Sequence, residues 1–154
     1  MDEVRFVVHG NPVPKARART VTEVGKRGEK KTRSYTPEST AIHEQNIGWV
    51  YKSIYHNFKF PEGVPLRLSC DFYFEVPKTY RKTKVTKRMM EDMLSGKVRP
   101  MNKKDPDNLL KTVADAGNGV IYDDDEQIVE MQARKFFSNK PRTEIFIARI
   151  DNEE

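Results

Sequence analysis

The chain has 154 residues, of which 33% are charged and 36% hydrophobic, and its formal net charge is +5. This length is typical of one compact domain. No apolar run approaches the roughly 20 residues that a bilayer crossing needs, which excludes a membrane-spanning helix. The lone cysteine, Cys70, rules out an internal disulfide framework and a cysteine-based zinc site. A lone thiol suits a reducing compartment, so we expect a cytoplasmic protein.

Positive charge is concentrated in the first two thirds of the chain. Residues 1–104 contain 22 Lys and Arg against 11 Asp and Glu, whereas residues 105–154 contain 6 against 12. Basic surfaces bind polyanions because binding releases counterions, so nucleic acid is the first partner to consider. The alternative is ordinary solvated surface charge.

A basic arm follows the Pro-rich turn at residues 11–14. Proline favours extended backbone, and in an extended chain Lys15, Arg17 and Arg19 would point to one side because they alternate with single residues between them. These cations would then suit a track of DNA phosphates. The arm continues into a basic insert over residues 20–34, which we expect to be flexible at its glycine-flanked tip.

Hydrophobic periodicity divides the chain into strands and helices. Alternation of apolar and polar residues marks strands, and apolar residues at every third or fourth position mark helices. The order of elements predicts an α+β fold: a single domain with a mixed or antiparallel sheet and packed helices. The predicted strands span residues 4–9, 66–76, 128–137 and 143–150, and the predicted helices span residues 36–55, 85–95 and 109–116.

The same periods assign individual side chains to the core. The predicted buried face of the first helix consists of Ile47, Val50, Tyr51 and Ile54. Trp49 lies near this stripe, so we interpret it as a core residue rather than as a platform for base stacking. Cys70 falls on the inward side of its strand and is interpreted as core rather than as a nucleophile.

The first chemical signal is a pair of carboxylates at the start of the last helix. Pro106 disfavours helix at Asp105, so we expect an extended segment in which Asp105 and Asp107 point the same way. Asp107 or Asn108 would then cap the helix. Lys111 follows Asp107 by one turn and lies on the same helix face.

A second carboxylate cluster, residues 123–125, comes just before a predicted strand. A helix start and a strand start joined by a short loop can lie side by side, which would bring the first carboxylates toward Asp124 or Asp125. Converging carboxylates repel unless a cation joins them, and oxygen ligands without His or Cys select Mg²⁺, with Mn²⁺ as a substitute. Such an ion can activate water at a phosphodiester while Lys111 offsets developing charge. The competing interpretation is a helix cap and a solvated turn.

Several motifs along the chain form one combined pattern. They are Gly10-x-Pro12-x-Pro14-Lys15-x-Arg17-x-Arg19, Tyr35-Thr36-Pro37, Asp105-x-Asp107-Asn108-Leu109-x-Lys111, Asp115-Ala116-x-Asn118-Gly119-Val120 and Asp124-Asp125-Glu126-Gln127-Ile128. Over roughly residues 4–150, this pattern resembles the RusA family of Holliday-junction resolvases. The resemblance implies a small homodimeric endonuclease of bacteria or prophages. It further implies binding to four-way DNA junctions and Mg²⁺-dependent, symmetric cutting of two strands in DNA recombination and repair.

The resemblance also implies roles for individual residues. It assigns metal binding and catalysis to Asp105, Asp107 and Asp125. It gives Lys111 a part in the phosphoryl chemistry, and it places the basic arm along DNA. Asp124 would support the site from outside it.

The sequence departs from the family pattern at residues 104 and 117 and by its charged insert over residues 20–34, and it leaves two alternatives open. Lys104 stands where the family usually has Pro, and Gly117 replaces a usual Leu, which would loosen the end of the helix. One alternative is a non-catalytic, architectural DNA-binding protein whose acidic residues only cap and solvate. The other is a metal nuclease that acts on other branched DNA or on RNA.

Overall fold

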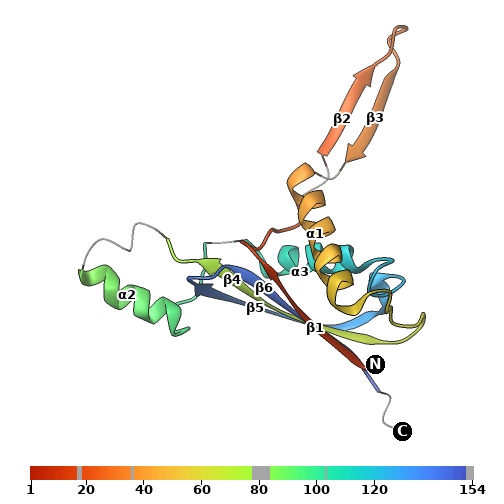
Figure 1. Ribbon diagram of the computed structural model, residues 1–154. Helices are drawn as coiled ribbons and strands as arrows, with labels where there is room; N and C mark the ends of the chain where they lie inside the picture. Colours follow the sequence, from red (N-terminus) through yellow and green to blue (C-terminus); the bar gives the residue numbers. More distant parts are fainter. Residues whose placement is uncertain (17–18, 36, 78–83, 103, 152–154) are drawn as a thin grey trace.

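A four-stranded mixed sheet forms the centre of the computed structural model, which describes residues 1–16, 19–35, 37–77, 84–102 and 104–151 (Figure 1). The strands lie in the order β1 (Glu3–His9), β6 (Arg142–Arg149), β4 (Leu66–Glu75) and β5 (Ile128–Ser138). The β4 and β5 strands are parallel, and the other neighbours are antiparallel. The predicted α+β fold with a mixed sheet and packed helices is therefore confirmed.

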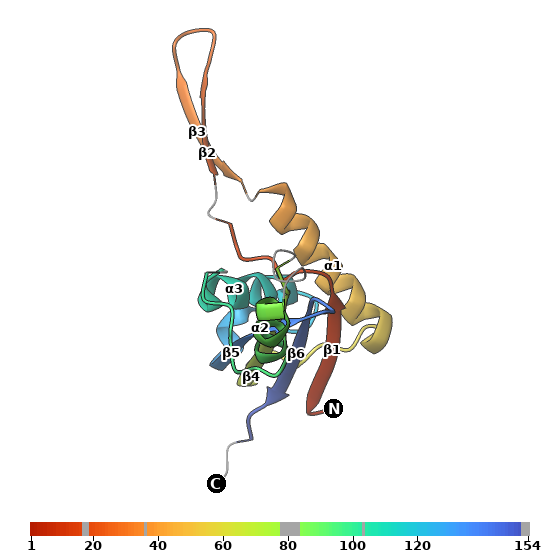
Figure 2. The same ribbon diagram turned by 90° about the vertical axis from the view of Figure 1, so that its left-hand side faces the viewer.

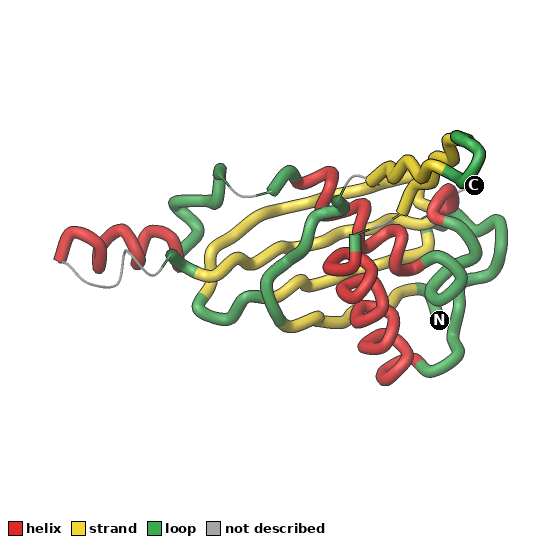
Figure 3. Tube along the Cα trace, turned by 90° about the horizontal axis from the view of Figure 1, so that it is seen from above, coloured by secondary structure: helices red, strands yellow, loops and turns green. Residues whose placement is uncertain are grey.

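Helices cover one face of this sheet, because its strands alternate apolar and polar residues. In β1, Val4, Phe6 and Val8 are buried and the residues between them are exposed. Helices α1 (Glu38–Tyr55) and α3 (Pro106–Gly117) pack on the buried face (Figure 3). Cys70 in β4 is 1% exposed and lies in this core, as predicted.

Helix α2 (Lys84–Leu94) extends beyond one end of the sheet, where it contacts β5 (Figures 1 and 3). Its position and bounds agree with the predicted helix over residues 85–95. No helix within the described residues combines the length and the apolar character needed to cross a bilayer.

The buried face of α1 is narrower than the sequence predicted. Ile47 and Tyr51 are buried, but Ile54 is 50% exposed and Trp49 is 78% exposed. Trp49 is two positions from both buried residues and therefore about 200° around the helix from each, so it faces solvent. In the last turn it is Tyr55 that packs, with its ring stacked 5.2 Å from that of Tyr51. The predictions that Trp49 and Ile54 are core residues were wrong.

A two-stranded β-ribbon projects from the body of the molecule (Figures 1 and 2). It consists of β2 (Arg19–Val24) and β3 (Lys30–Tyr35), which pair antiparallel. The structure shows a regular hairpin in the basic insert over residues 20–34, and the predicted flexibility of this insert stays a prediction. Its Thr and Val residues favour strand, but they do not form the apolar stripe by which a strand is recognised in a sequence.

Candidate active site

The start of α3 differs from the prediction and changes how its two carboxylates lie. Asp105 precedes the helix with extended backbone (φ −64°, ψ 136°), and Pro106 is the first helical residue. Proline suits this position because its fixed φ is helical and its missing N–H would have no partner there. Asp107 is therefore in the first helical turn, and the expectation that Asp107 or Asn108 caps the helix was wrong. Both carboxylates are exposed.

The turn that follows α3 depends on Gly117, the last residue of the helix. Tyr122 is buried, and its hydroxyl donates a hydrogen bond to the carbonyl of Ala114. A Cβ atom on Gly117 would lie 2.5 Å from the Tyr122 Oη, so only glycine permits this approach. The expectation that Gly117 loosens the helix end is corrected, because the tyrosine ring fills the space. The turn brings residues 123–125 beside α3.

Polar side chains fix the loop that carries Asp125. The Asp125 N–H donates to Asn118 Oδ1 at 2.8 Å, and the Glu126 N–H donates to Asp124 Oδ1 at 2.9 Å. Asp124 thereby caps the short 3₁₀ helix η2 (Asp125–Gln127). The buried Gln127 side chain donates to two backbone carbonyls of the loop before β4, at 3.0 and 3.2 Å. The loop is thus tied both to α3 and to the sheet.

Asp125 lies among other carboxylates and one ammonium group. Partial burial, a hydrogen bond with Asp124 and the charges of Asp115 and Asp124 raise its pKa. The Lys111 ammonium acts in the opposite direction, and its Nζ is 3.9 Å from Asp115 Oδ2. Asp107 lies one turn before Lys111 on the same face of α3. Lys111 therefore lies one turn from Asp107 along α3 and is close enough to Asp125 for its charge to act on that carboxyl.

Sequence reasoning gave no role to Asp115, although its spacing from Lys111 placed both on one helix face. The Lys15 Nζ is 3.1 Å from Asp115 Oδ2 and 2.6 Å from Glu44 Oε1 in α1. Burial opposes the charge of Lys15, but its hydrogen bonds and ion pairs with these carboxylates outweigh that effect and raise its pKa. The Lys15 N–H also donates to the Asn108 carbonyl at 2.8 Å. Lys15 therefore joins α1 to α3.

The basic arm predicted to contact DNA is only partly described by the structure. The Lys15 ammonium faces the two carboxylates, and its predicted contact with DNA stays a prediction. Arg17 lies outside the described residues. Arg19 is the first residue of β2, where the backbone alone is described, so its predicted DNA contact also stays a prediction.

The predicted metal cluster of Asp105, Asp107 and Asp125 likewise stays a prediction. Within the described part of the chain, no three His, Cys, Asp or Glu side chains gather closely enough to hold a metal ion. The donor chemistry fits Mg²⁺, because every candidate ligand is a carboxylate oxygen. The raised pKa of Asp125, which burial and neighbouring carboxylates cause, also marks negative charge that a divalent cation would offset.

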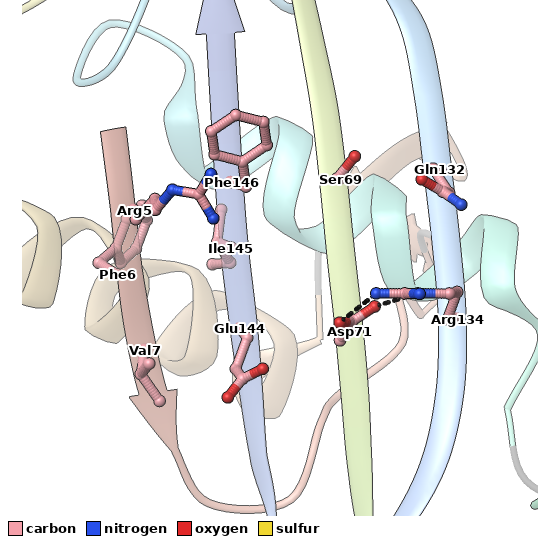
Figure 4. A pocket seen from close by; sticks show the side chains of 10 residues that line it. All are labelled: Arg5, Phe6, Val7, Ser69, Asp71, Gln132, Arg134, Glu144, Ile145 and Phe146. Atoms are coloured by element: carbon pink, nitrogen blue, oxygen red, sulfur yellow. Dashed lines mark hydrogen bonds and ion pairs between the residues drawn. The ribbon is translucent and has the colours of Figure 1, made fainter. Parts of the chain in front are cut away.

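A hollow of about 470 Å³ on the other face of the sheet contains none of the predicted site residues (Figure 4). Asp71 accepts hydrogen bonds from the Arg134 guanidinium at 2.7 and 2.8 Å. The Arg5 guanidinium stacks over the ring of Phe146, 4.1 Å from its centre. Because these charged groups are engaged with their neighbours on the sheet, we locate the candidate active site at α3 and the Asp125 loop instead.

Comparison with known proteins identifies the family of this chain. Residues 9–148 match the family described as Endodeoxyribonuclease RusA. The chain is also 32% identical over 153 residues to the uncharacterized protein YqaN of Bacillus subtilis (strain 168), an alignment that covers 97% of this chain and 99% of the relative. The family match includes both acidic segments, α3 and the whole ribbon. The chain therefore belongs to the RusA family of endodeoxyribonucleases.

Proposed function

We propose that this family member is an Mg²⁺-dependent endonuclease that resolves four-way DNA junctions by paired, symmetric nicks in DNA recombination and repair. Family membership makes it a nuclease of branched DNA in general. The observation that best supports the proposal is the position of Lys111, which is one turn from Asp107 on α3 and whose charge partly offsets the effects that raise the pKa of Asp125. We propose that the two acidic segments meet around this side chain.

The carboxylates and Lys111 would divide the chemistry between them. Asp105, Asp107 and Asp125 would hold Mg²⁺, which when bound activates water and neutralises charge at a phosphodiester oxygen. Lys111 would lie beside the scissile phosphate and offset the charge that develops there. Asn118 holds the Asp125 backbone in place. The family resemblance suggests in-line attack that leaves a 5′-phosphate.

Symmetric nicking needs two active sites related by a two-fold axis, so we propose a homodimer. A junction would be recognised mainly through its phosphates and its shape. The expected setting is the bacterial cytoplasm, with the protein encoded by the host or by a prophage. Mn²⁺ should substitute for Mg²⁺, because both prefer oxygen ligands.

The central test replaces one carboxylate at a time without changing its size. Asp107→Asn and Asp125→Asn should keep junction binding but lower single-turnover cutting on the order of a hundredfold or more, because each removes a charge that the metal and the phosphate chemistry need. Asp123→Asn is the matched control. Its carboxylate belongs to the same acidic run but pairs with Lys59 at 2.5 Å, so cutting should stay near the wild-type rate.

The substrates for this test are labelled four-way junction, fork, duplex, single-stranded DNA and RNA, each with Mg²⁺, with Mn²⁺ and with chelator. Preferential, metal-dependent cutting of the four-way junction supports the proposal. Binding without cutting under every condition would show a non-catalytic DNA-binding protein. Faster cutting of forks or of RNA would move the substrate to another branched or single-stranded nucleic acid. Wild-type rates for both Asp→Asn variants would show that the site is placed wrongly.

A further inference from the structure

The β2–β3 ribbon is exposed on both of its faces. Strand β2 pairs with β3 from Arg19 opposite Tyr35 to Val24 opposite Lys30. Of the ribbon residues whose side chains are described, Val21 is half-buried and all the others are exposed; Val24 is 69% exposed. Figures 1 and 2 show the ribbon standing away from the sheet and helices in both views. An isolated two-stranded ribbon is only marginally stable, so one that projects in this way is suited to a partner.

The tip of the ribbon is a tight turn that presents two cations. The Gly28 N–H donates to the Gly25 carbonyl at 3.0 Å, and the Gly25 N–H donates to the Glu29 carbonyl at 2.7 Å. Gly28 has φ +77°, the left-handed conformation that this type of hairpin loop requires and that glycine adopts without strain. Lys26 and Arg27 occupy the two central positions of the turn and are exposed. They are therefore the outermost charges of the ribbon.

The charge of the ribbon is strongly biased. Residues 19–35 contain six Lys and Arg against two Glu, so the ribbon accounts for a net charge of +4. Hydroxyl side chains, which can also donate to phosphate oxygens, stand among the cations at Thr20, Thr22 and Thr32. An exposed apolar patch that could bury against a protein is missing from the described side chains, of which only Val21 and Val24 are aliphatic. The charge and the composition both favour a polyanion over a protein partner.

We infer that the β2–β3 ribbon is a DNA-binding arm that enters a groove of a duplex next to the cut site, with Lys26 and Arg27 against the phosphates. The major groove of B-DNA accepts a two-stranded ribbon. The ribbon is joined to the body just after Lys15, which contacts α3 through both its backbone and its ammonium group. DNA held at α3 is therefore within reach of the arm. The inference rests on the proposed function only in taking branched DNA as the substrate.

The first experiment measures the affinity for four-way junction and for plain duplex at several salt concentrations, in chelator so that no cutting occurs. Lys26→Gln/Arg27→Gln should lower the slope of log affinity against log salt by about 2, because each cation that is removed no longer neutralises a phosphate. The control, Lys97→Gln/Lys140→Gln, removes the same charge from two other exposed lysines. The inference requires a smaller decrease in slope for this control than for the tip variant.

A second experiment locates the tip on DNA. Cys70 is the lone cysteine and is buried, so Lys26→Cys supplies the one accessible thiol for an iron–EDTA reagent. Hydroxyl radicals from the tip should cut a short stretch of one duplex arm. The same reagent on Glu62→Cys, an exposed site outside the ribbon, should not produce that pattern.

These readouts separate the arm from the active site. An unchanged salt slope in the tip variant, or tethered cleavage no more localised than that from Glu62→Cys, would overturn the inference even if the wild type resolves junctions. A reduced slope and localised cleavage would support the arm even if the wild type failed to cut. Failure of the wild type to cut would then contradict the proposed function and not the inference about the arm.

Discussion

The Lys15 ammonium lies between two carboxylates that belong to different helices. Glu44 comes from α1 and Asp115 from α3, and the side chains of Lys15, Glu44 and Asp115 are between 18% and 21% exposed. Asp115 in turn raises the pKa of Asp125. A lysine in the arm predicted to follow DNA therefore also links α1 to α3 and pairs with a carboxylate that acts on Asp125.

Removing this ammonium should destabilise the protein. Lys15→Met leaves two partly buried carboxylates facing one another, and we expect a decrease of about 1–3 kcal/mol in the free energy of unfolding, less than for a fully buried pair because solvent screens the charges. Glu44→Gln should cost less, since Lys15 keeps Asp115. The effects of the two changes on the free energy of unfolding should be non-additive, because Lys15 and Glu44 contact each other. Urea unfolding followed by circular dichroism measures all three variants.

The opposite pattern would give Lys15 a different role. If Lys15→Met left unfolding unchanged and weakened DNA binding, its ammonium would leave the two carboxylates when DNA binds. Unchanged unfolding in the double variant as well would show that the interactions with Glu44 and Asp115 contribute nothing in solution.

At the scale of elements, two glycines in helices meet opposite surroundings. Gly117 at the end of α3 lies against the Tyr122 ring, whereas a Cβ atom on Gly48 in α1 would meet nothing within 4 Å. Gly117→Ala should therefore destabilise the fold by about 1–3 kcal/mol, because the added methyl must displace a buried tyrosine. Gly48→Ala should stabilise it by about 0.5–1 kcal/mol, because alanine has the higher helix propensity.

Thermal or urea unfolding of these two variants should show a decrease in stability for Gly117→Ala and an increase for Gly48→Ala. Gly117→Ala should also slow junction cutting if the turn positions the Asp125 loop, while Gly48→Ala should leave cutting unchanged. Equal effects of the two changes on stability would contradict the close approach of Gly117 and Tyr122.

Sequence periodicity predicted the elements of the sheet layer well, because burial against a sheet imposes a period that is visible in the residues. The strands β1, β4, β5 and β6 and the three helices were all expected close to their observed bounds. Two errors have local causes. Pro106 indicated an extended segment, although its fixed φ also suits the first helical position. Trp49 was assigned to the core because it lies near the apolar stripe, although its angle around α1 directs it outward.

The candidate site was less accessible to sequence reasoning, because its interactions join distant parts of the chain. The motifs pointed to Lys111 and to both acidic segments. No pattern could show that Lys15 pairs with Glu44, which is 29 residues away. The place of Tyr122 against Gly117 was hidden for the same reason. The ribbon was missed because it has no buried face, and without burial there is no stripe to detect.

On the scale of the whole molecule, we propose different roles for the acidic segments and for the basic ribbon. The Asp125 loop lies beside α3, and the basic ribbon projects from the body that carries both (Figure 1). One such subunit has one candidate active site, whereas paired nicks in two strands need two. Symmetric cleavage requires two sites related by a two-fold axis. Full resolution should therefore need both active sites of a dimer, whereas nicking of a single strand should need only one.

A mixed dimer tests this separation. Wild-type subunits and Asp107→Asn subunits, carrying different affinity tags, are combined and purified through both tags in turn. The mixed dimer should bind a four-way junction as tightly as the wild type but nick a single strand, so nicked junctions accumulate and linear products do not. The symmetric wild-type dimer, tagged in the same two ways, serves as the control and should release linear products. If the mixed species resolved junctions fully, one subunit would have to make both cuts in succession, and if no mixed species survived purification while cutting scaled with subunit concentration, the active form would be a monomer.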